Sequence, residues 1–172
     1  MNFSIAGIMR RLWAPRHELS CPAALWTRLL DALRERGGGR HESGAFLLGL
    51  RDDAGRARIH DFVLYDDLDP HSLDSGIVRF DGRYFSDLWT ICERRGLEVV
   101  ADVHTHPGGS WQSGSDQAHP MIARDGHVAL IVPDFARRGI RREDVGVYRY
   151  RGAGRWDTVP PALRRRFFTL CP

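Results

Sequence analysis

Residues 97–116, LEVVADVHTHPGGSWQSGSD, contain the pattern from which the fold of the chain is best approached. The apolar first half of this stretch predicts a buried β-strand, and the strand continues directly into His104 and His106. Side chains two residues apart on a strand point to the same face, so we expect both imidazoles to lie together. A glycine-rich loop follows, and Asp116 comes ten residues after the second histidine at the start of a predicted helix.

The sequence on either side predicts helices and strands in a mixed order. The expected elements are a helix over 20–37, strands over 42–50 and 57–65, a helix over 83–95, the strand over 97–103, a short helix over 116–124 capped by Ser115, a strand over 128–132, strands over 145–150 and 155–159, and a helix over 161–170. The two hairpins interrupt any regular βαβ alternation. The order therefore indicates an α/β sandwich whose mixed, mostly antiparallel sheet is flanked by helices.

The length and composition fit one soluble domain. The chain has 172 residues, and its 25 basic and 22 acidic side chains give a net charge of +3, too small to indicate nucleic-acid binding by itself. All 25 basic residues are arginine. We divide the chain into an N-terminal arm over 1–19, a catalytic domain over 20–160 and a basic tail over 161–172, expected to dock as a helix.

The three cysteines and the N-terminal sequence favour a cytoplasmic location. Cys21, Cys92 and Cys171 are odd in number and form no CxxC pair, so they indicate neither a disulfide scaffold nor a cysteine-type zinc finger. The first thirteen residues place their arginines after the apolar run, the wrong order for a signal peptide. No run approaches the roughly 20 apolar residues of a membrane span, so we expect no membrane association.

The histidine pair and Asp116 have the composition of a metal site. Two imidazoles and one carboxylate are a common three-ligand set for catalytic zinc, which leaves a fourth position for water. We therefore expect one Zn²⁺ per chain, held by His104, His106 and Asp116. Glu42, at the start of a core strand, is the candidate general acid/base, and Ser113 is the candidate hydrogen-bond donor to an oxyanion.

Each of these residues has a plainer interpretation when it is taken alone. An isolated His-x-His pair is more often two unrelated histidines, Glu42 alone would be a strand-edge charge, and Ser113 alone would be an ordinary loop or cap residue. The combination is stronger, because it joins a His-x-His-Pro sequence, a Ser-x-x-Asp sequence and an upstream glutamate at a strand start.

The combined pattern resembles the JAMM motif of the MPN-plus metalloproteases, and it is closest to their small prokaryotic JAB-domain branch. The residues that carry the resemblance are Glu42, His104, His106, Pro107, Ser113 and Asp116. It implies the MPN-domain fold, a cytidine-deaminase-like sandwich, with the ligand, acid/base and oxyanion roles assigned as above. The family's usual seven residues between the second histidine and the serine are six here, 107–112.

The resemblance also implies an activity: a zinc isopeptidase that cleaves after the C-terminal glycine of a ubiquitin-like protein. Such an enzyme matures a precursor or removes the modifier from its conjugates, together with E1-like and E2-like proteins in bacterial conjugation or antiphage systems. Two other readings stay open, a JAB peptidase that processes sulfur-carrier proteins and a non-catalytic zinc-containing interaction module. The oligomeric state is open as well.

An aspartate-rich segment over 66–81 is the best candidate for contacts with a substrate tail. An extended piece over 76–80, which includes Gly76 and Val78, occupies the place where the family pairs an inserted strand with such a tail. Asp67 and Asp69 are expected to attract a basic tail, and Trp111 is expected to cover it. A solvated acidic loop explains the same aspartates equally well.

Overall fold

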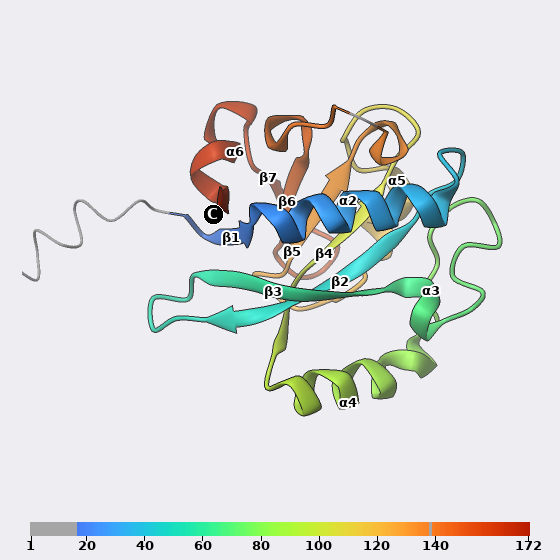
Figure 1. Cartoon of the computed structure of the whole chain (residues 1–172), viewed down its shortest axis with the longest axis horizontal. Helices are drawn as coiled ribbons and strands as arrows, with labels where there is room; N and C mark the ends of the chain where they lie inside the picture. Colours follow the sequence, from blue (N-terminus) through green and yellow to red (C-terminus); the bar gives the residue numbers. More distant parts are fainter. Residues whose placement is uncertain (1–16, 138) are drawn as a thin grey trace, which may run out of the picture.

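The computed structural model of the protein describes residues 17–137 and 139–172. Within them the chain forms one eight-stranded curled sheet flanked by helices, a mixed α/β fold (Figure 1). The strands lie in the order β7-β6-β5-β4-β2-β3-β1-β8. The first sixteen residues of the expected N-terminal arm lie outside the described part of the chain.

The strands and helices have the following bounds. The strands are β1 (Leu19–Pro22), β2 (Gly44–Arg51), β3 (Ala57–Leu64), β4 (Glu98–Thr105), β5 (Val128–Val132), β6 (Gly146–Tyr150), β7 (Trp156–Thr158) and β8 (Phe168–Cys171). The helices are α2 (Ala23–Gly37), α3 (Tyr65–Leu68), α4 (Phe85–Arg95), α5 (Gly114–Ala118) and α6 (Pro161–Phe167). Single 3₁₀ turns lie at Gly82–Tyr84, Asp134–Ala136 and Arg142–Asp144.

The centre of the sheet is antiparallel, and parallel pairs flank it. β2 pairs antiparallel with both β3 and β4, whereas β4 pairs parallel with β5, and β1 pairs parallel with both β3 and β8. β5, β6 and β7 continue antiparallel to the other edge. Because β4 and β5 run in the same direction, the loops that follow them emerge at the same end of the sheet.

The two faces of the sheet are covered differently. α2 packs its apolar side chains, including Leu29 and Leu33, on one face, and α4 buries Leu88 on the other (Figure 1). Phe46 packs in the cluster around Leu88 and lies opposite Asp102 across the β2–β4 pair. Residues directly opposite each other in an antiparallel pair share a face, so Asp102 and His104 point towards the α4 side.

Several sequence predictions are confirmed, and their signals were local. α2 ends at Gly37, and its C-cap residue Gly38 adopts a left-handed conformation with φ 56°, as the run of three glycines predicts. β5 occupies the predicted range over 128–132, and both predicted hairpins form. In the described part of the chain, none of the helices combines the length and apolar character that a membrane crossing requires.

Four predicted elements differ from the structure. Residues 19–22 form β1 instead of the first turn of a helix, so the helix begins at Ala23 without a side-chain cap. The tail helix ends at Phe167, and β8 follows it in the same sheet. The helix near Asp116 is only five residues long and is capped by Ser113 instead of Ser115. The segment over 76–80 carries no assigned strand.

Candidate metal centre

The end of β4 presents two buried imidazoles to one point. The Nε2 atoms of His104 and His106 lie 3.0 Å apart, and each residue is only 6% exposed. The N–H and the carbonyl of the second histidine both form backbone hydrogen bonds. His106 N–H donates to the carbonyl of Val132 at 2.9 Å, and Phe135 N–H donates to the carbonyl of His106 at 2.8 Å. The ring positions are therefore fixed by the β4–β5 pair and the turn that follows it.

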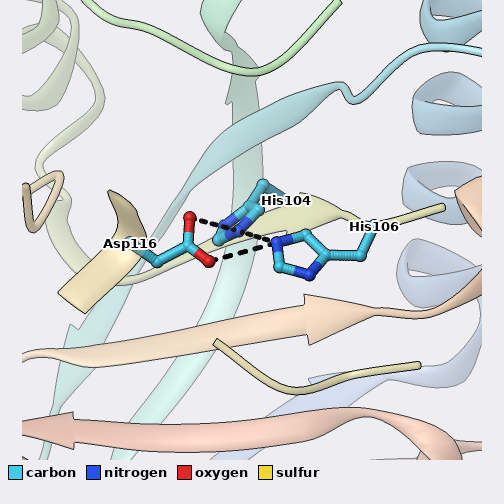
Figure 2. Close-up of side chains that lie close together, drawn as sticks. All are labelled: His104, His106 and Asp116. Atoms are coloured by element: carbon cyan, nitrogen blue, oxygen red, sulfur yellow. Dashed lines mark hydrogen bonds and ion pairs between the residues drawn. The ribbon is translucent and has the colours of Figure 1, made fainter. Parts of the chain in front are cut away.

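Asp116 reaches the same point from the first turn of α5. Its Oδ1 lies 3.4 Å from Nε2 of His104, and its Oδ2 lies 3.2 Å from Nε2 of His106 (Figure 2). A capping box with Ser113 fixes this carboxylate. Asp116 N–H donates to the Ser113 hydroxyl oxygen at 3.1 Å, and Ser113 N–H donates to Asp116 Oδ2 at 2.6 Å. The loop therefore returns to the end of β4 as predicted.

The three side chains fit a metal ion. One ligand atom from each lies within 4.8 Å of the other two. Ligands at zinc bond lengths of about 2.0–2.2 Å in a tetrahedron lie roughly 3.3–3.6 Å apart, close to the separations seen here. Two imidazole nitrogens facing each other at 3.0 Å in a buried site also need a positive charge between them or a proton on one ring. His104, His106 and Asp116 therefore form the candidate metal-binding group of the chain.

Without a metal, the charges in the cluster stabilise one another. Burial raises the pKa of Asp116, but hydrogen bonds from His104 and His106 outweigh it and hold that pKa well below its usual range. Burial lowers the pKa of His104, but the Asp116 carboxylate outweighs this effect and leaves that pKa raised. The site is thus built for a cation, since it favours positive charge beside a carboxylate that stays ionised.

Glu42 lies beside the three ligands without being one of them. Its Oε1 is 3.9 Å from Nε2 of His106, and its side chain is 13% exposed. The other carboxylate oxygen accepts a hydrogen bond from Val78 N–H at 3.2 Å, and Glu42 N–H donates to the carbonyl of Gly76 at 3.1 Å. The structure therefore places Gly76 and Val78 against the candidate base. A carboxylate in this position can accept a proton from a water at the cluster.

Ser113 and Trp111 lie on the loop between the ligands. The Ser113 oxygen accepts the Asp116 N–H, which leaves its hydroxyl proton free to donate elsewhere. Trp111 is 67% exposed, and its ring lies so close to Gly109 that a Cβ there would meet it at 1.8 Å. Tyr148 OH donates to the carbonyl of Ser110 at 2.7 Å, which ties the loop to β6.

The two aspartates predicted to contact a substrate tail have different surroundings. Asp67 is about half exposed and pairs with Arg36 of α2 at 2.7 Å, and Asp66 pairs with the same guanidinium. Asp69 is only 4% exposed, and its carboxylate accepts the backbone N–H groups of His71 and Asp81 at 3.0 and 2.9 Å. Asp69 therefore holds the loop together and does not face solvent, which does not favour a direct contact with substrate.

Sequence reasoning missed a buried polar network next to the ligands. Asp102 is 1% exposed and accepts hydrogen bonds from His127 Nε2 at 2.6 Å and Tyr65 OH at 3.2 Å. Desolvation and the neighbouring Asp102 raise the pKa of Tyr65, so its hydroxyl stays protonated. The sequence does contain a signal of this network, because Asp102 lies two residues before His104 in an apolar strand and therefore shares a face with both histidines.

Comparisons with known proteins were made for the whole chain. No family model matches it. Over 143 residues it is 29% identical to "Probable metalloprotease y4jG" of Sinorhizobium fredii, covering 80% of this chain and 85% of the relative. Its fold is similar to the solution structure of protein DSY2949 from Desulfitobacterium hafniense, with a TM-score of 0.64, 14% identity, and coverage of 89% of this chain and 92% of that chain. At this identity the likeness concerns the fold alone.

Proposed function

We propose that the protein is a zinc-dependent isopeptidase or peptidase that cleaves after the C-terminal glycine of a ubiquitin-like protein. The observation that carries the proposal is the position of Glu42, whose carboxylate lies 3.9 Å from the His106 ring at the edge of the His104–His106–Asp116 cluster. A carboxylate next to the ligands but outside the ligand set is the arrangement that metal-assisted hydrolysis requires.

Two further observations support a metallopeptidase. The similarity to a protein named a probable metalloprotease extends over most of both chains. Two imidazoles and one carboxylate form a ligand set found in catalytic zinc sites, whereas structural zinc sites are closed by four protein ligands. The described residues bring three ligands together, and a structural site has no use for Glu42. These points favour an enzyme over an interaction module.

The residues of the chain can be assigned to the steps of amide hydrolysis. Zinc held by the cluster would polarise the scissile carbonyl and lower the pKa of a bound water towards about 7. Glu42 accepts the proton of the attacking water and returns it to the leaving amine. The free hydroxyl proton of Ser113 donates to the oxyanion of the tetrahedral intermediate, while Asp116 N–H holds the serine oxygen in place.

The loop next to Glu42 supports the proposed substrate class. An extended tail that lies along Gly76–Phe80 reaches the cluster at the carboxylate that accepts the Val78 N–H. Glycines at the cleavage site suit this approach, because they bring no side chain between the tail and the cluster. Asp67 remains exposed enough to attract a basic tail, whereas Asp69 contributes only through the loop.

We extend the proposal to the cellular role as well. The enzyme would mature the modifier or release it from conjugates in the cytoplasm of a bacterium. E1-like and E2-like proteins of the same conjugation or antiphage system would supply those conjugates. The absence of lysine would then spare the enzyme from modification on its own side chains.

The test uses a ubiquitin-like protein from a neighbouring reading frame, extended past its terminal glycine. Zinc-loaded wild type is compared with Glu42→Gln, and Glu93→Gln on the exposed side of α4 serves as the matched control. We expect wild type and the control to cut after the glycine, as read by intact mass. Glu42→Gln should bind one zinc per chain and lose about 10²–10⁴-fold in rate. Cleavage by Glu42→Gln at the wild-type rate would contradict the assignment of the base.

A further inference from the structure

We propose that Thr105, the residue between the two histidines, is a positioning residue that fixes Glu42 over the metal site through the backbone of Ser43. The inference rests on the proposed function, since it assigns Thr105 a part in the same hydrolysis. Its hydroxyl faces away from the ligands, because neighbouring residues on a strand point to opposite faces. Thr105 therefore acts through another residue and does not touch the reacting atoms.

The contacts between Thr105 and Ser43 form a two-sided clamp. Ser43 N–H donates to the Thr105 hydroxyl oxygen at 3.0 Å, and Thr105 N–H donates to the Ser43 carbonyl at 2.9 Å. Thr105 is fully buried and Ser43 is 1% exposed, so water does not compete for either of these two hydrogen bonds. The Ser43 hydroxyl donates to the carbonyl of Leu33 at 2.7 Å, which ties the clamp to α2.

The clamp lies one residue from the candidate base. β2 begins only at Gly44, so the Ser43 N–H lies before the strand and depends on the Thr105 side chain for its acceptor. On its other side, Glu42 is held by Gly76 and Val78 of the loop. If the Thr105 acceptor is lost, the loop alone determines where the carboxylate lies. The orientation of the peptide between Glu42 and Ser43 is therefore what the hydroxyl controls.

Threonine is the residue type that this position needs. Valine has nearly the same shape but no acceptor, so Thr105→Val leaves the Ser43 N–H buried without a partner. Serine keeps the acceptor and loses only a methyl group. Since His104, His106 and Asp116 are held by other contacts, the two variants should separate the position of Glu42 from the binding of the metal.

The experiment compares metal-loaded wild type with Thr105→Val and Thr105→Ser, with Ile59→Val as the matched control. Ile59 is fully buried in β3 and pairs with Gly49, away from the end of β2 that adjoins the clamp, so Ile59→Val reproduces a loss of stability alone. We expect Thr105→Val to keep metal affinity and KM and to lose about 10- to 100-fold in kcat. Thr105→Ser, which restores the acceptor, and Ile59→Val should stay near the wild-type kcat. In a Glu42→Gln background, Thr105→Val should cause no further loss.

A structural measurement separates failure of this inference from failure of the proposed function. Crystal structures of the metal-loaded proteins should show the Glu42 carboxylate displaced from His106 in Thr105→Val and in place in Thr105→Ser. That result, with no peptidase activity in the wild type, would uphold the clamp and reject the function. An unmoved Glu42 carboxylate in Thr105→Val, or loss of metal in proportion to activity, would overturn the role of Thr105.

Discussion

Gly44→Ala is a substitution for which the structure predicts a large loss of stability from one added methyl group. Gly44 begins β2, pairs with His104 of β4, and lies under the ring of Tyr65. A methyl group at this position would lie 2.2 Å from Cε2 and 2.6 Å from Cδ2 of Tyr65, and 2.9 Å from the carbonyl oxygen of Val103. The Val103 carbonyl belongs to the backbone of β4, which the sheet holds in place. The Tyr65 ring is therefore the group that must move.

The cost follows from what holds that ring. Ordinary contact begins near 3.4 Å, so the ring must move by about 1.2 Å. Tyr65 is fully buried against Phe46, with ring centroids 4.7 Å apart, and its hydroxyl donates to Asp102. Overpacking of a core costs about 1–3 kcal/mol, and loss of a buried hydrogen bond to a carboxylate costs about 1.5–3 kcal/mol. We therefore expect a loss of about 3–5 kcal/mol in the free energy of unfolding.

Urea unfolding followed by tryptophan fluorescence measures this loss. Gly82→Ala is the control, because a Cβ there meets only Phe85 at 4.0 Å and should change stability little. In a double-mutant cycle, Tyr65→Leu should offset part of the Gly44→Ala loss by making room for the methyl group. A loss below about 1 kcal/mol for Gly44→Ala, or strict additivity in the cycle, would refute the reasoning.

Three further predictions concern metal binding, a thiol and a turn. Zinc at 100 times its dissociation constant should raise the free energy of unfolding by about 2.7 kcal/mol. Asp116→Asn should abolish most of this gain. A full gain in the variant would exclude Asp116 as a ligand. Burial, with a smaller contribution from the neighbouring Cys171, raises the pKa of the Cys21 thiol to about 12. In the native protein at pH 8, an alkylating reagent should therefore modify Cys171 and leave Cys21 unmodified, which peptide mass mapping measures. Ala153 has φ 51° in the exposed turn between β6 and β7; Ala153→Gly should raise stability by about 0.5–1 kcal/mol in urea unfolding, and a loss would show that the left-handed conformation carries little strain.

Elements with local signals were predictable from the sequence, and elements defined by distant pairing were not. β5 is an apolar run between Gly126 and Pro133, so both its ends are marked in the sequence. The sequence of β1 predicts a helix start, because a serine and a proline before an apolar face are typical of one. What makes it a strand is parallel pairing with β3 and β8, and β8 lies about 150 residues away. No local pattern encodes such a pairing.

The same distinction applies to the candidate site. The convergence of His104, His106 and Asp116 was predictable because the two histidines share a strand face and a spacing of ten residues is long enough to return the aspartate to them. The role of Asp69 was not predictable, since an aspartate that binds two backbone N–H groups looks the same in sequence as one that faces solvent. Charge alone predicts attraction of a basic tail, whereas the burial of Asp69 depends on the path of the loop, which the sequence does not reveal.

The spacing between His106 and Ser113 is one residue shorter than in the family that the sequence resembles, and the capping box makes this spacing compatible with the arrangement of the candidate site. Ser113 and Asp116 are joined by two reciprocal hydrogen bonds within one helical turn, so they move as a single unit. A change in loop length would therefore alter the path over 107–112 without changing how the candidate ligand Asp116 and the candidate oxyanion donor Ser113 are arranged relative to each other. The loop in turn is fixed by Tyr148 at Ser110 and by the turn after β5 at Gly108. The geometry that chemistry needs thus resides in the strand end and the helix start, and the loop length between them can vary while Asp116 still reaches both histidines.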